Sequence, residues 1–241
     1  MSSTHISVPG SNNLDITVYG NGTVIAGGGN DNIDITGRGK IVVGAGADTL
    51  SLGQGGVISQ LGSAGQDTIN IGTGKTTIHE QGQATVTGAF GSATIFGGVL
   101  KVTDFHGITK ETAVSGSTTL IGGAAATKFI GGTGSVSMVG GTGNDTFVGG
   151  SGQETMVGGS GNDLFEFVKA EKGGNALIQN FVSGQDQLYL EGHTLKYLES
   201  HGDVSVQGGN TYITLDGGKT TIELQGVTDL KSSDVTTNKH H

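Results

Sequence analysis

The chain has 241 residues and a formal net charge of −9, with 48 glycines, one proline and no cysteine. The negative charge argues against nucleic acid or an anionic membrane as the main partner, and the lack of cysteine excludes disulfides, thiolate metal sites and thiol redox chemistry. Glycine is about three times as frequent as its usual share of about 7%, without a collagen triplet, and the apolar residues fall in short β-type runs, which favours a narrow layered core over disorder.

The N-terminal third alternates short apolar runs with glycine-rich turns. Residues 1–10 have neither a basic start nor an apolar run, so they predict no secretory signal peptide, and no segment approaches a membrane span. Three of the turns end in an aspartate, namely Asp31, Asp48 and Asp67, and the units between them carry no acid. We interpret residues 1–82 as degenerate turns of a β-roll.

The glycine pattern thins between residues 83 and 121, while β-type runs continue. The pair Gly97–Gly98 is not repeated nine residues later. We interpret residues 83–121 as solenoid turns without metal, or as a seam between two rolls.

Residues 122–166 consist of five units of nine residues. Each unit opens with a glycine pair, which a helix could not hold, and has a large apolar residue at its eighth position: Phe129, Met138, Phe147, Met156 and Phe165. A single short strand cannot bury such a side chain, so neighbouring units must stack into a continuous core. The sequence therefore predicts a solenoid.

The nonapeptides stop after Glu166. Residues 204–206, 211–215 and 220–224 read as antiparallel strands, and Asp216-Gly-Gly between the last two predicts a hairpin. We expect residues 167–235 to cap the end of the solenoid, which would otherwise expose apolar side chains and strand edges. Residues 236–241 are expected to be a tail, and the two terminal histidines could remain from a tag.

The units beginning at Gly140 and Gly158 follow Gly-Gly-x-Gly-x-Asp-x-large apolar-x at every defined position. This pattern resembles the calcium-binding β-roll of the repeats-in-toxin (RTX) family. The other units depart from it, with Glu154, Val136 and Thr127 at the aspartate position. The resemblance implies an all-β fold: a parallel β-roll or β-solenoid of glycine-rich nonapeptide turns with a C-terminal antiparallel β cap.

In that family two nonapeptides make one full turn, which implies that Asp145 and Asp163 share one edge with Thr127. The opposite edge would then carry Thr118, Val136 and Glu154. The three N-terminal aspartates, 17 and 19 residues apart, should share an edge too. Ca²⁺ takes carboxylate and carbonyl oxygens, although the aspartates could simply form turns. The predicted calcium ligands are Asp31, Asp48, Asp67, Asp145 and Asp163, with Gly140, Gly141, Thr142, Gly158 and Gly159.

The sequence predicts no enzyme, because the seven histidines are scattered and no catalytic motif is found. The resemblance implies a bacterial protein that leaves the cell by type I secretion, with an uncleaved signal in residues 226–235, and stays outside the cell or on its surface. Our leading hypothesis is a structural protein that folds on Ca²⁺ and forms a homo-oligomer, polymer or adhesive in an extracellular layer, such as a surface layer, filament or biofilm matrix. The alternatives are a polysaccharide-binding module and a small secreted bacteriocin or toxin.

Overall fold

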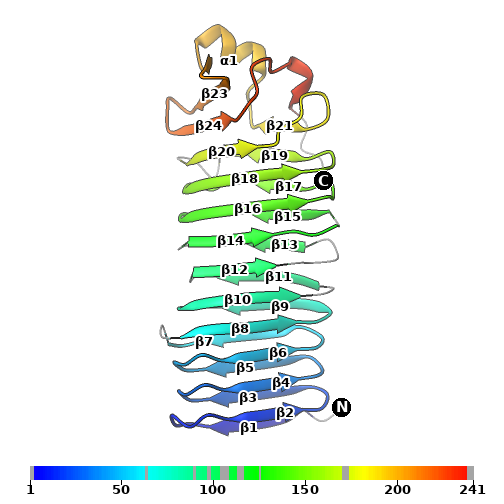
Figure 1. Ribbon diagram of the computed structural model, residues 1–241, viewed down its shortest axis with the longest axis vertical. Coiled ribbons are helices and arrows are strands. Elements are labelled where there is room, and N and C mark those ends of the chain that lie inside the picture. Colours follow the sequence, from blue (N-terminus) through cyan, green and yellow to red (C-terminus); the bar gives the residue numbers. More distant parts are fainter. Residues whose placement is uncertain are drawn as a thin grey trace.

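A computed structural model describes residues 3–62, 65–88, 91–96, 99–103, 109–112, 117–124, 126–169 and 174–237, with only the backbone described between residues 91 and 112. The chain winds into a tall stack of coils with two strands per coil, one on each of two opposite faces (Figure 1). The prediction of an all-β parallel solenoid is confirmed.

Three sheets build the stack. Sheet 1 contains β1 (Thr4–Val8), β3 (Gly22–Ala26), β5 (Gly39–Val43), β7 (Gly56–Gln60), β9 (Gly74–His79) and β11 (Gly91–Phe96). Sheet 3 continues the same face with β13 (Thr109–Thr112), β15 (Thr127–Ile130), β17 (Thr146–Val148), β19 (Leu164–Phe167), β21 (Gln187–Leu190) and β25 (Val235–Thr236). Sheet 2 forms the opposite face with β2 (Asp15–Val18), β4 (Asn32–Ile35), β6 (Thr49–Leu52), β8 (Gln66–Ile71), β10 (Gln83–Gly88), β12 (Val99–Thr103), β14 (Ser117–Ile121), β16 (Ser135–Gly141), β18 (Gln153–Gly159), β20 (Asn175–Gln179), β24 (Thr220–Leu224), β23 (Asn210–Leu215) and β22 (Val204–Gln207).

The core lies between the two faces, because side chains alternate inward and outward along each strand. In the nonapeptide coils the predicted eighth-position residues are all fully buried. Phe129, Phe147 and Phe165 stack on one another with ring centroids 5.0 Å and 4.9 Å apart. That separation matches the spacing of about 4.8 Å between neighbouring strands, so one ring per coil fills the core.

The backbone of residues 83–121 continues the coil. Strands β10, β12 and β14 pair in parallel within sheet 2, whereas sheet 1 ends at β11 and sheet 3 begins at β13. We expect this segment to bind no metal. That prediction depends on side chains that lie outside the described part of the chain between residues 89 and 116. The same is true of the terminal histidines. The division of the chain at residues 82, 121, 166 and 235 stays a prediction.

The C-terminal cap contains the predicted antiparallel strands β22, β23 and β24. The predicted hairpin turn is present, and its residues Asp216, Gly217 and Gly218 all have positive φ. A short helix that the sequence analysis did not predict, α1 (Leu195–His201), covers this end (Figure 1). The described residues include no helix with the length and apolarity needed to cross a membrane.

Asp234 ties the C-terminal 3₁₀ turn η2 (Ser232–Asp234) to the cap. Its carboxylate accepts hydrogen bonds from Ser183 Oγ at 2.7 Å, Gly184 N at 2.9 Å and Lys231 N at 2.9 Å. Burial opposes ionisation of this group, but these donors and the charge of Lys231 outweigh it, so its pKa is lowered.

Candidate calcium ladders

The aspartates of the nonapeptide turns form a column at the edge of sheet 3, where β17 and β19 begin. The Oδ1 atom of Asp163 accepts a hydrogen bond from the backbone N–H of Asp145 at 2.8 Å. The Oδ1 atom of Asp145 accepts one from the N–H of Thr127 at 2.7 Å. Asp145 and Asp163 therefore share an edge with Thr127, as the sequence predicted. The column continues to Asp186, whose Oδ1 accepts from Asp163 N at 2.9 Å. We call it the C-terminal ladder.

A second column, which we call the N-terminal ladder, lies where β4, β6 and β8 of sheet 2 begin. The Oδ1 atom of Asp48 accepts from the N–H of Asp31, and that of Asp67 from the N–H of Asp48, each at 2.8 Å. Asp31 in turn accepts from Leu14 N at 3.0 Å. The predicted common edge of these three aspartates is confirmed.

The two ladders lie on opposite edges of the solenoid. Strands of sheet 2 begin where those of the other face end, and the register of sheet 2 carries the position of Asp67 through Ala84 and on to Thr118, Val136 and Glu154. These last three residues form the other edge of the nonapeptide coils, as predicted. Glu154 is buried, and its Oε1 accepts from Gly150 N at 3.2 Å.

The second oxygen of each predicted aspartate ligand is buried and has no hydrogen-bond partner. This applies to Oδ2 of Asp31, Asp48, Asp67, Asp145 and Asp163, whose side chains are only 1–2% exposed. A buried carboxylate oxygen without a donor is costly. Columns of such oxygens suit a hard divalent cation, which binds carboxylates and backbone carbonyls. The residues present therefore fit Ca²⁺.

The glycines of the nonapeptide turns make room for these carboxylates. A Cβ atom at Gly140 would collide with Oδ2 of Asp145 and with the carbonyl of Gly158, and one at Gly158 would collide with Oδ2 of Asp163. Gly141, Thr142 and Gly159 instead join neighbouring coils, for example through the hydrogen bond from Thr142 N to Gly123 O at 3.0 Å. Gly140 and Gly158, the first glycine of each matching unit, are therefore the glycines that lie beside the carboxylates.

Burial also raises the pKa of the ladder carboxyls. Desolvation is the largest cause, opposed by the backbone donors, and raises the pKa of Asp48, Asp67 and Asp145 to about 6. Neighbouring carboxylates raise it further. The pKa values of Asp31, Asp163 and Asp186 are raised for the same first reason. A bound cation would supply the positive charge that this environment lacks.

A hollow of about 450 Å³ opens on the C-terminal ladder. It is lined by Asn144, Asp145, Thr146, Asn162, Asp163, Leu164, Gly184, Gln185 and Gln187. Within the described part of the chain, no three His, Asp or Glu side chains form a group that could hold a metal ion. Each ladder position offers two carboxylates, and backbone carbonyls are the further ligands that Ca²⁺ accepts.

Sequence reasoning missed two carboxylates that accompany the ladders. Asp186 follows a glycine turn and precedes an apolar strand, and this sequence, Gly184-Gln-Asp186-Gln-Leu188, is the signal that could have placed it in the ladder. Glu80 is 3% exposed, and Asp67 is among the groups that affect its pKa. Glu80 stands at no repeat position, so no sequence pattern marks it as part of a ladder.

Comparison with known families supports the interpretation of the nonapeptides as RTX-type calcium-binding repeats. Residues 130–165 match the family model of the RTX calcium-binding nonapeptide repeat, in four copies. None of the curated proteins compared with the chain matches it. The matched segment includes the aspartates Asp145 and Asp163, and the N-terminal ladder lies before it. The chain is therefore an all-β solenoid that carries RTX-type repeats in residues 130–165, and such repeats bind calcium ions.

Proposed function

We propose that the chain is a calcium-binding structural protein that folds on Ca²⁺ outside a bacterial cell and then assembles or adheres in an extracellular layer, such as a surface layer, filament or biofilm matrix. The observation that carries the proposal is the two columns of buried aspartate oxygens without hydrogen-bond partners. RTX-type repeats are typical of secreted bacterial proteins, and the type I route remains part of the proposal.

Calcium binding and folding are coupled in this proposal. The carboxylates of successive coils come together only in the stacked form, so the ligand set is absent from the unfolded chain. Sites with two carboxylates belong to the weak extracellular range, with dissociation constants on the order of 10⁻⁴ to 10⁻³ M. Low calcium inside the cell would keep the chain unfolded for export, and higher calcium outside would fold it.

The two opposite sheet faces of the stack (Figure 1) support assembly between copies. Along the outer face of sheet 2 the outward positions are mainly Ser, Thr, Asn and Gln. Such surfaces lack the like-charge repulsion that keeps proteins apart. We therefore propose association of these faces after folding.

Far-UV circular dichroism and light scattering test the two parts of this proposal separately. With calcium, we expect β structure to form and the scattering mass to rise, and a chelator should reverse at least the first change. The same concentration of Mg²⁺ serves as the control. Unchanged dichroism would overturn calcium-coupled folding, whereas a folded monomer at every calcium level would overturn assembly.

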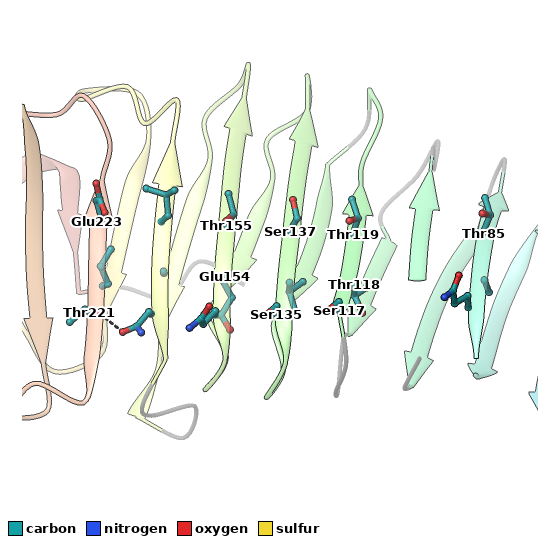
Figure 2. A pocket seen from close by; sticks show the side chains of 18 of the residues that line it. Thr85, Ser117, Thr118, Thr119, Ser135, Ser137, Glu154, Thr155, Thr221 and Glu223 are labelled. Atoms are coloured by element: carbon teal, nitrogen blue, oxygen red, sulfur yellow. Dashed lines mark hydrogen bonds between the residues drawn. The ribbon is translucent and has the colours of Figure 1, made fainter. Parts of the chain in front are cut away.

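A groove favours polysaccharide binding as a second candidate function. It has a volume of about 970 Å³ and runs across the strands on the outer face of sheet 2. Figure 2 shows one row of side chains from successive strands, with Thr119, Ser137 and Thr155 in sequence. Hydroxyl groups repeated at the strand spacing can donate and accept hydrogen bonds along an extended sugar chain. Tyr212 lines the same groove.

Retention of the folded protein on an immobilised polysaccharide tests this second function. Thr155→Arg places a long side chain in the groove and should abolish retention. The matched control is Thr77→Arg, which places the same side chain on β9 of the opposite face. Equal retention of both variants and of the unchanged protein would exclude the groove as the binding surface.

A further inference from the structure

The two ladders end differently. The C-terminal ladder ends at Asp186, and both of its oxygens have backbone donors: Oδ1 accepts from Asp163 N at 2.9 Å and Oδ2 from Val182 N at 2.8 Å. In the N-terminal ladder the position after Asp67 is Ala84, its register partner in β10. Asp67 therefore has no aspartate on the next coil, and its Oδ2 is buried without a partner.

Glu80 brings a carboxylate to this end of the N-terminal ladder from the other face. It directly follows β9, and only 3% of its surface is exposed. Its Oε1 accepts from Gly82 N at 2.8 Å, and no N–H or O–H group of the described residues donates to its buried Oε2, whose carboxyl group interacts with that of Asp67. The pKa of Asp67 is raised to about 6, by burial first and then by the nearby Glu80. Glu80 also lies between β9 and β10, just before Ala84, the register partner of Asp67, so the two carboxyl groups are neighbours.

Gln60 adds an independent observation at the same place. Ser59 and His79 are register partners in β7 and β9, so Gln60 and Glu80 follow as neighbours one residue further along. Gln60 is 1% exposed, and neither its Oε1 nor its Nε2 has a hydrogen-bond partner. The residue at this position on the preceding coil is Val43, which is fully buried. A buried amide without partners is rare in proteins, and an apolar residue serves at the same position one coil earlier.

We propose that Asp67, Glu80 and Gln60 form a closing cation site at the end of the N-terminal ladder, occupied by Ca²⁺. Two carboxylates and an amide oxygen are hard ligands of the kind that Ca²⁺ takes. The site differs from a nonapeptide site because two of its three side chains come from the ends of β7 and β9, in sheet 1, and not from an aspartate turn. The competing explanation is a proton shared between Asp67 and Glu80, which would leave Gln60 without a role.

The inference rests on the proposed calcium-binding function, so its test uses the full chain and counts bound ions. Calcium bound per chain is measured by equilibrium dialysis at pH 7.5, and affinity by calorimetry. Glu80→Gln keeps the shape of the side chain and removes its charge, so we expect one ion fewer per chain. The control is Glu199→Gln, at an exposed position of α1, which should leave the ion count unchanged.

Gln60→Glu adds a negative charge to the same site, whereas Glu80→Gln removes one. A third carboxylate should tighten calcium binding, on the order of tenfold, because affinity rises with ligand charge. If the cluster held only a proton, the extra carboxylate would lower stability and leave calcium binding unchanged. The two variants thus predict opposite changes in affinity, so loss of folding in one of them cannot imitate the expected pair of results.

The outcomes separate this inference from the proposed function. One ion lost in Glu80→Gln together with tighter binding in Gln60→Glu supports the closing site. An unchanged ion count and affinity in both, with an ion lost in Asp145→Asn, overturns the closing site and leaves the proposed function intact. A chain that binds no calcium overturns both.

Discussion

Each ladder aspartate uses its two oxygens differently. Oδ1 accepts a backbone N–H from the previous coil, at 2.7–3.0 Å, and so joins one coil to the next. Oδ2 is buried without a donor in Asp31, Asp48, Asp67, Asp145 and Asp163. The Oδ1 hydrogen bond stabilises the stack with or without metal. The buried Oδ2 atom destabilises the stack unless a cation is bound to it.

Replacing Asp145 should therefore reduce the stabilisation of the fold by calcium more than replacing Glu154 on the opposite edge does. In Asp145→Ala the calcium-induced gain in unfolding free energy should fall by about 1.4 kcal/mol for each ion lost, at ten times its dissociation constant. Chemical denaturation with calcium and with a chelator measures that gain. Glu154→Ala is the comparison, and equal losses in the two variants would show that the edges do not differ.

A separate prediction concerns Gly140, whose lack of a side chain leaves room for the carboxylate of Asp145. In Gly140→Ala the new methyl group would collide with that carboxylate and with the backbone of the next coil. We expect a loss of about 1 to 3 kcal/mol in stability, as for other overpacked sites, and weaker calcium binding. Gly28→Ala is the matched control, since its methyl would meet only the carbonyl of Ala45, at 3.3 Å. A similar loss in both variants would contradict the role of Gly140.

The sequence located the ladder residues well but not the residues that close them. The resemblance to the RTX roll, in which two nonapeptides make one turn, implied that Asp145 and Asp163 share an edge, because a regular repeat converts sequence distance into position in space. Glu80 and Gln60 follow no repeat, and they become neighbours only through the parallel register of β7 and β9. Such contacts depend on coil length, which varies from 17 to 20 residues in the N-terminal coils.

At the scale of single elements, three stacked phenylalanines form a regular column in the core. Phe147 lies between Phe129 and Phe165, with ring centroids 5.0 Å and 4.9 Å away and interplanar angles of 18° and 9°. Each ring stacks on a ring of the neighbouring coil, so the column joins three coils, and Phe147 and Phe165 lie in the matched repeats. Stacked aromatic pairs add about 0.5–1.5 kcal/mol beyond the area they bury.

Phe147→Ala should open a cavity between two rings that cannot close it, because both are fixed to their own strands. We expect a loss of about 3 to 5 kcal/mol in the free energy of unfolding, measured by urea denaturation in saturating calcium. Phe147→Leu keeps an apolar side chain there and should lose clearly less. If both variants lost less than about 1 kcal/mol, the stack would not be a main source of stability.

Elements outside the repeats were predicted unevenly. The hairpin between β23 and β24 was found from Asp216-Gly-Gly, since turns with positive φ require such residues. The helix α1 was missed, although Thr194 at its start and Gly202 at its end are good caps. A helix of seven residues has too few turns for a clear apolar period, and only one pair of leucines, Leu195 and Leu198, marks its buried side.

On the scale of the whole molecule, the two ladders place carboxylates on opposite edges of one continuous stack. The N-terminal ladder joins coils through β4, β6 and β8, and the C-terminal ladder joins coils through β17, β19 and β21. Sheet 2 runs unbroken between them through the pairing of β10, β12 and β14. Calcium bound at the N-terminal ladder would stabilise coils of sheet 2, and calcium bound at the C-terminal ladder would stabilise coils of sheet 3. The full calcium response of the stack therefore needs both ladders.

The raised pKa values predict how the metal-free protein responds to pH. Asp48, Asp67 and Asp145 have pKa values of about 6 in the folded chain against 3.8 for an ordinary aspartate, so between pH 4 and 6 the folded state binds more protons than the unfolded state. Stability is then present at low pH and is lost as pH rises through 6. With a chelator present, we expect a higher Tm at pH 5 than at pH 7.5.

With calcium present we expect the opposite order, a higher Tm at pH 7.5 than at pH 5, because calcium binds the ionised carboxylates and competes with protons. Its stabilising effect should be large at pH 7.5 and small at pH 5. Differential scanning calorimetry at the two pH values, with and without calcium, measures all four Tm values. Asp145→Asn cannot gain or lose a proton at this position, so it should reduce the pH dependence of the metal-free chain. A metal-free Tm that rises with pH would contradict the burial of uncompensated carboxyls in both ladders.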